Sequence, residues 1–164
     1  MSSSSMRAIA RAYLLNPPLP GLSEIKPGWD NQMELVAAGG MVPDQSVAAL
    51  HIVSETEQRV SVPAVLGIRM VHYVLELQIC YMVDGDSEEI VGGVDRLVES
   101  VKARLRADPR MGQVASAVFE AAQGPGAQIT VQRGDVQYVN TGLANSLASQ
   151  WVAVRWTATE EIQA

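Results

Sequence analysis

Cysteine, aromatic residues and long apolar runs are all scarce in this sequence. With Cys80 as its one cysteine among 164 residues, the chain can form no internal disulfide, which fits a reducing compartment better than a small secreted scaffold. No apolar run approaches the roughly 20 residues that cross a bilayer. Residues 1–5 also lack the charged and apolar regions of a signal peptide. These absences predict neither export nor a membrane anchor.

Basic residues are outnumbered as well, 12 against 18 acidic ones, which gives a formal charge of −6 and a pI near 4.8. This balance is poorly suited to binding nucleic acid by neutralising phosphates. What the sequence does contain is 48% apolar residues, valine prominent among them, which predicts an aliphatic core built largely on strands. We expect a disordered tip at 1–5 and a single domain over 6–164, with a long loop at about 22–46.

Hydrophobic periodicity and turn residues divide this domain into helices and strands. The clearest helix spans 88–107, where apolar residues recur at a 3.6-residue spacing. Asp86 and Glu89 have capping-box spacing at its start, and Asp108-Pro109 ends it. The other expected elements are a helix over 6–15, strands over 47–55, 68–83, 128–133, 136–139 and 151–160, an extended piece from 60 and a second short helix over 111–123.

The strand over 68–83 alternates between an apolar and a mixed face, so one face is expected to lie in the core. At about 3.3 Å per residue the strand would extend roughly 50 Å, which is longer than most strands. The core face carries Val71, Tyr73, Leu75, Leu77, Ile79, Tyr81 and Val83, and the mixed face carries Met70, His72, Glu76, Gln78 and Cys80.

Residues that usually carry catalysis are few, and their spacing predicts no catalytic, cofactor-binding or metal site. His51 and Glu55 share a strand face, as do His72 and Glu76, but each pair is separated by about 13 Å, too far for one metal or one acid–base pair. A cross-strand cluster of His51, His72 and Cys80 is an alternative to hydrogen-bonded histidines and a buried thiol. The glycines lack the strand, helix and lysine context of a phosphate-binding loop.

Charged residues gather at both ends of the long helix. The acidic turn at 84–89 is explained by turn and capping chemistry, or by contact with a basic neighbouring subunit. The basic residues from 96 to 110 form either a solvated face or a face that docks a partner. Arg133-Gly134-Asp135 matches a cell-adhesion tripeptide, but a turn between two strands accounts for Gly-Asp there.

The order of these elements resembles that of tail terminator proteins of long-tailed bacteriophages. The likeness covers about residues 47–162 together with the first helix. It rests on the His-Tyr strand at 72–77, the helix that leads into Leu-Arg-Ala-Asp-Pro-Arg at 105–110, and the closing strand at 152–160 that runs into Thr-Ala-Thr-Glu.

The resemblance implies an α+β fold, with a mainly antiparallel mixed sheet of about four to five strands packed by a long helix and one or two shorter helices. It also implies a structural protein without enzymatic activity or cofactor. Such a protein forms a hexameric ring on the tail tube protein, ends tube growth and offers a joining surface for a head-completion or connector protein. It belongs to the virion, at the tail or neck, and assembles in the bacterial cytoplasm. DNA passes through the ring without specific binding, which suits an acidic chain because carboxylates repel phosphate.

Two other functions remain open: a head-closure or head–tail adaptor protein of the phage neck, and a small ligand-binding α+β domain. We hypothesise that the segment 22–44 and the acidic turn make inter-subunit or axial contacts. Deleting residues 28–40 is then expected to impair assembly and to leave the monomer folded. The candidate contact residues are Trp29, Asp30, Met33, Asp84, Asp86, Glu88, Glu89, Arg104 and Arg110.

Overall fold

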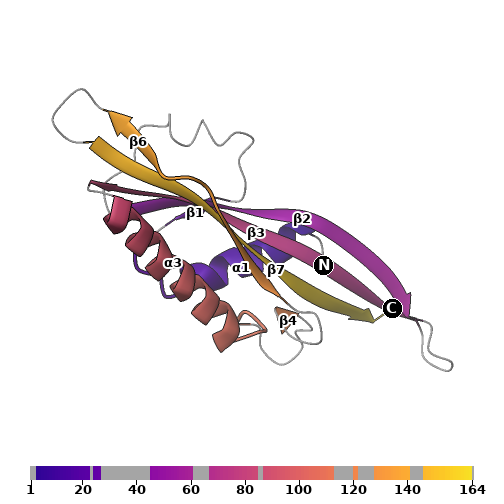
Figure 1. The fold of residues 1–164 in the computed structure, drawn as a ribbon. Coiled ribbons are helices and arrows are strands. Elements are labelled where there is room, and N and C mark those ends of the chain that lie inside the picture. Colours follow the sequence, from indigo (N-terminus) through magenta and orange to yellow (C-terminus); the bar gives the residue numbers. More distant parts are fainter. Residues whose placement is uncertain are drawn as a thin grey trace.

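Two helices and one mixed sheet make up the described part of the chain in the computed structural model (Figure 1). The structure describes residues 3–22, 24–26, 45–60, 67–84, 87–112, 120–121, 128–140 and 146–163. Within these ranges the helices are α1 (Ser3–Leu15) and α3 (Ser87–Ala107). The strands are β1 (Ile25–Lys26), β2 (Gln45–Val60), β3 (Ile68–Asp84), β4 (Glu120–Ala121), β5 (Ile129–Arg133), β6 (Gln137–Asn140) and β7 (Ser146–Gln163).

The sheet has the order β1-β2-β3-β7, and β4, β5 and β6 pair one after another with the outer edge of β7. It is therefore five strands wide. The β1–β2 pair is parallel and every other described pair is antiparallel. The predicted α+β class with a mainly antiparallel mixed sheet is confirmed.

One face of the sheet is packed by both helices, and we call it the helix-covered face. Its residues on β3 are the predicted core positions, of which Tyr73, Leu75, Leu77 and Ile79 are at most 1% exposed. The strand period of two places them all on the same side. Residues of α1, α3 and β7 complete this core: Met6, Ala10, Leu14, Ile90, Val94, Leu97, Val98, Val101, Leu105, Val152, Val154 and Trp156. The other side, which carries Glu76, Gln78 and Cys80, is called the opposite face.

The long helix is held close to the sheet at Gly93. A methyl group added there would lie 2.5 Å from Cε1 and 2.9 Å from Oη of Tyr81, closer than atoms can pack. The neighbouring Gly92 has room, since its nearest atom would be Nη1 of Arg96 at 3.5 Å. Gly93 therefore sets the distance between α3 and β3.

The two glycines predict opposite effects of the same substitution. Gly93→Ala is expected to lower the free energy of unfolding by about 1–3 kcal/mol because it overpacks the helix against Tyr81. Gly92→Ala is expected to raise it by about 0.5–1 kcal/mol because alanine favours the helix. Urea unfolding of both variants tests this, and a change of the same sign in both would contradict the close packing at Gly93.

Two strands are longer than the sequence predicts. The expected strand 47–55 and the extended piece from 60 form a single strand, β2, which passes an irregularity between Ile52 and Ser54 and continues to Val60. The last strand begins at Ser146 instead of 151. Residues 53–59 are all exposed, so no hydrophobic alternation marks them, and it is pairing with β3 that keeps them extended.

Three other expectations need correction. The helix α1 begins at Ser3, so residues 3–5 do not belong to a tip. The expected loop at 22–46 includes the parallel strand β1, whose Ile25 is fully buried. The expected helix over 111–123 is wrong at both described ends, because Met111 and Gly112 form a turn with positive φ and Glu120–Ala121 is strand β4. Residues 27–44 and 113–119 lie outside the described residues.

Candidate functional site

The acidic candidates that the structure describes lie at the corner between β3 and α3. Asp84 is the last residue of β3 and pairs with Leu147 of β7. Glu88 and Glu89 are exposed in the first turn of α3, where a carboxylate complements the positive end of the helix dipole. The remaining acidic and N-terminal candidates, Trp29, Asp30, Met33 and Asp86, lie outside the described residues.

The basic candidate Arg104 contacts the end of the other helix. Its Nη1 donates hydrogen bonds to the carbonyl oxygens of Tyr13, at 3.1 Å, and Pro17, at 2.8 Å. In return, the Tyr13 hydroxyl donates to the Arg104 carbonyl at 2.6 Å, and the guanidinium lies 5.9 Å from the Tyr13 ring centre. The last carbonyls of a helix have no partner within it, so Arg104 caps α1 and fastens it to α3.

Removing this contact is expected to loosen α1. Arg104→Ala should lower the free energy of unfolding by about 1–2 kcal/mol, because two carbonyl oxygens lose a charged donor. It should also speed amide hydrogen exchange in α1. Arg106→Ala is the matched control, since Arg106 is exposed on the same helix and should change stability by less than about 0.5 kcal/mol. Equal losses in the two variants would contradict the capping role.

The described candidates do not form one site. Arg110 is exposed just after α3, where its backbone N–H donates to Oδ1 of Asp108 at 3.0 Å. At about 1.5 Å per residue, Glu88 and Arg104 lie about 24 Å apart along α3. The helix therefore presents an acidic start and a basic end as two separate surfaces.

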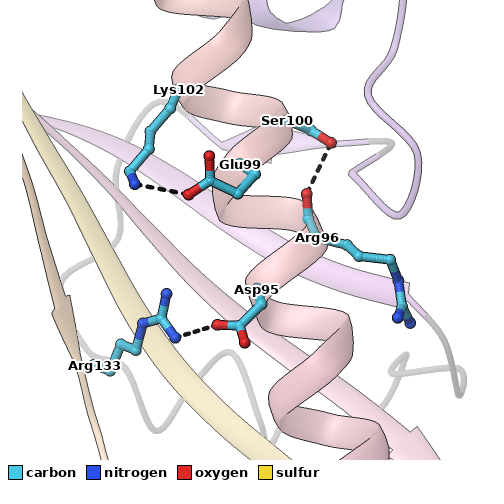
Figure 2. Close-up of polar contacts among 6 residues, drawn as sticks. All are labelled: Asp95, Arg96, Glu99, Ser100, Lys102 and Arg133. Atoms are coloured by element: carbon cyan, nitrogen blue, oxygen red, sulfur yellow. Dashed lines mark hydrogen bonds and ion pairs between the residues drawn. The ribbon is translucent and has the colours of Figure 1, made fainter.

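Between these ends, a set of polar contacts lies along α3 (Figure 2). Arg133 of β5 forms an ion pair with Asp95, which ties the sheet edge to the helix. Lys102 lies 2.8 Å from Glu99 and, by hydrogen bonding to it, holds the pKa of that exposed carboxyl below its usual value. Figure 2 shows the Arg96 side chain pointing away from these pairs.

The opposite face carries a polar row that sequence reasoning missed. The register of the three long strands places His51 beside Glu76, and Glu76 beside Arg155. Nε and Nη2 of Arg155 both donate to Oε2 of Glu76, at 2.9 and 2.5 Å, and the Gln78 amide donates to Oε1 at 2.7 Å. Glu76 is only 7% exposed, so its charge depends on these partners.

The environment of Glu76 favours the ionised carboxylate. Burial alone would raise its pKa, but the hydrogen bonds from Arg155 and Gln78 and the nearby His51 together hold the pKa below its ordinary value. A hollow of about 310 Å³ adjoins the pair and is lined also by Gln132, Trp151 and Ala153. Such a hollow can bind a polar group, but the Glu76 carboxylate is ionised and already paired with the Arg155 guanidinium.

The alternative cluster of His51, His72 and Cys80 does not form. These three residues lie in different rows of the opposite face. His72 and Cys80 pair with Thr159 and Trp151 of β7, whereas His51 of β2 pairs with Glu76. Burial raises the pKa of the Cys80 thiol to about 12. Among the described residues no group of three potential ligands is close enough to hold a metal ion.

The outer edge of β2 is the longest backbone surface without a described partner. The strand β1 pairs only with Ala48 and Ala49. From 50 to 60 no described strand lies against this edge, although the inner edge pairs with β3 to the end. The exposed backbone N–H and C=O groups of an edge strand can form hydrogen bonds with a strand from another chain. We call residues 50–60 of this edge the β2 edge.

No family model and no curated protein matches the chain. In the ranges that the structure describes, neither helix is both long and apolar enough to cross a membrane.

Proposed function

We propose that this protein is a tail terminator of a long-tailed bacteriophage. In this role it caps the tail tube as a hexameric ring, ends tube polymerisation and provides the surface that joins the head or neck. The proposal rests on the likeness of its sequence pattern to that family and on the contacts that the corresponding residues make with one another.

Those contacts join the two strands that carry most of the likeness, β3 and β7. Nδ1 of His72 lies 3.1 Å from Oγ1 of Thr159, and the Tyr73 hydroxyl donates to Oε2 of Glu160 at 3.0 Å. Tyr73 and Glu160 are both at least 96% buried. The His-Tyr segment and the closing Thr-Ala-Thr-Glu segment are thus parts of one structural unit, which supports treating them as a joint pattern.

A ring also needs subunit surfaces that differ from each other and meet head to tail. The acidic start and basic end of α3 are two exposed surfaces of opposite charge on one rigid helix. They supply a complementary pair of the kind that a closed ring uses.

The deciding experiment adds the purified protein to growing tubes of its cognate tail tube protein. A tail terminator binds tube ends, stops elongation and appears as a sixfold ring by electron microscopy. Binding only to portal or connector rings would contradict this function and favour a head-closure or adaptor protein instead. A small ligand-binding domain is the further candidate, favoured by the hollow beside Glu76 and Arg155. This candidate predicts that the protein binds a small molecule and binds neither tail tubes nor connector rings.

A further inference from the structure

The β2 edge combines an extended backbone with a particular order of charges. Residues 53–59 are all exposed, and the strand stays paired with β3 as far as Val60 and Ile68. In Figure 1 this half of β2 runs along the outer border of the sheet, away from α3. The edge is therefore already extended and would lose little conformational freedom on pairing.

The charged side chains of this edge lie on one side of the strand. Glu55, Glu57 and Arg59 neighbour Tyr73, Val71 and Arg69 in the register with β3. Arg69 lies 3.7 Å from Glu57 in an ion pair whose side chains are both nearly half exposed. Two acidic and two basic residues thus stand in a short neutral cluster, which is unusual on a chain with a formal charge of −6.

We propose that the β2 edge pairs antiparallel with the β2 edge of a second copy of this chain. Glu57 lies on the two-fold axis, opposite Glu57 of the partner subunit. Glu55 then faces the partner's Arg59, and Arg59 faces the partner's Glu55, so two opposite-charge pairs form across the contact. Each Glu57 keeps its own Arg69, which offsets the repulsion at the axis.

This register is selected by charge together with the length of the strand. Centring the contact on Gln58 would also oppose Glu57 to the partner's Arg59 twice, but it would pair only residues 56–60, because β2 ends at Val60. A shift by one residue toward the N-terminus would centre the contact on Thr56 and oppose Glu55 to the partner's Glu57 twice, which is repulsive. The proposed register also pairs all of residues 54–60 and sets Thr56 beside the partner's Gln58, two side chains that can hydrogen bond. Charged side chains and an irregularity such as the one between Ile52 and Ser54 usually discourage non-specific pairing at a sheet edge. In the proposed register the same charged side chains attract the partner strand.

The contact goes beyond the proposed ring. A two-fold contact closes after two copies, whereas a ring needs contacts between unlike surfaces. The inference is therefore a dimer of the free protein, independent of whether the protein caps a tail tube.

Charge exchange tests the dimer in sedimentation equilibrium of the full chain over a concentration series. The unchanged protein should show a monomer–dimer equilibrium. Arg59→Glu and Glu55→Arg should each weaken dimerisation by about tenfold, since the symmetric contact loses two attractive pairs and gains two repulsive ones. The double variant Glu55→Arg, Arg59→Glu should restore it. Arg96→Glu, an equal change of charge at an exposed residue in the middle of α3, should leave the dimer unchanged.

Three results would overturn the proposal: a wild-type protein that stays monomeric, single variants that dimerise like wild type, or a double variant that fails to recover. A sixfold ring on tubes, formed by a protein that stays monomeric in free solution, would overturn the edge dimer and leave the ring intact. A dimer that follows the charge exchange in a protein that never caps tubes would overturn the ring alone.

Discussion

Replacing Trp156 with alanine is expected to lower the free energy of unfolding by about 4 kcal/mol, a large share of the 5–15 kcal/mol typical of a domain. Among the residues that the structure describes, Trp156 is the largest fully buried side chain, at 1% exposure, and it lies centrally on β7 opposite Leu75. Its removal would leave a cavity between β7 and the helices. Thermal unfolding should show a fall of about 10 °C in Tm.

Trp156→Phe is the matched control for this prediction. Nε1 of Trp156 is buried, and no described residue accepts a hydrogen bond from it. Phenylalanine removes that unsatisfied donor and keeps most of the apolar ring, so we expect a loss of about 1–2 kcal/mol. A loss below about 1 kcal/mol in Trp156→Ala would show that the residue is not part of the core.

Replacing Arg155 with alanine is expected to lower the free energy of unfolding by about 2 kcal/mol. Glu76 would keep its hydrogen bond from Gln78 but lose both from Arg155 while staying buried. Because the Arg155 side chain is 47% exposed, water screens the pair and keeps the cost below that of a fully buried one. Arg69→Ala breaks the more exposed pair with Glu57 and should cost less than about 0.5 kcal/mol in the same urea titration.

The stability lost in Arg155→Ala is also expected to depend on pH. In the unchanged protein the pKa of Glu76 lies below its ordinary 4.5, so the pair stabilises the fold above that pH and is lost as pH falls through the lowered pKa. Without Arg155 the pKa of Glu76 rises. The stability difference between variant and wild type should therefore be largest at neutral pH and narrow in acid. A constant difference across the titration would contradict the ion pair.

Local patterns predicted most of the fold. The helix α3 has a 3.6-residue period, a capping signal and a proline stop, and its observed bounds, Ser87–Ala107, differ from the prediction by one residue. The alternation in β3 likewise predicted its buried face. The second half of β2 was not predictable in this way, because its exposed residues are held extended by β3 and show no hydrophobic period. The strand β4 has only two residues, too few to show any period.

The contacts that build the sites were not readable from the sequence. A period of two tells which face a residue occupies but not which residue on the next strand lies beside it. Glu76 and Arg155 are 79 positions apart, and Tyr13 and Arg104 are 91 apart. Sequence reasoning assigned Arg104 to a surface for partners, whereas its guanidinium is engaged within the chain. The proposed assembly surfaces therefore depend on the register, which only the structure supplies.

The position of β7 has a consequence for how the protein folds. This strand pairs with β3, β4, β5 and β6, yet Ser146–Gln163 is the last of them to be synthesised. Until it leaves the ribosome, β3 has one bare edge along its whole length and the short strands have nothing to join. Because contacts between distant residues form slowly, the nascent chain is expected to complete its sheet in a late step, once Ser146–Gln163 has emerged. During that interval it depends on protection from aggregation more than a helical protein of equal length does.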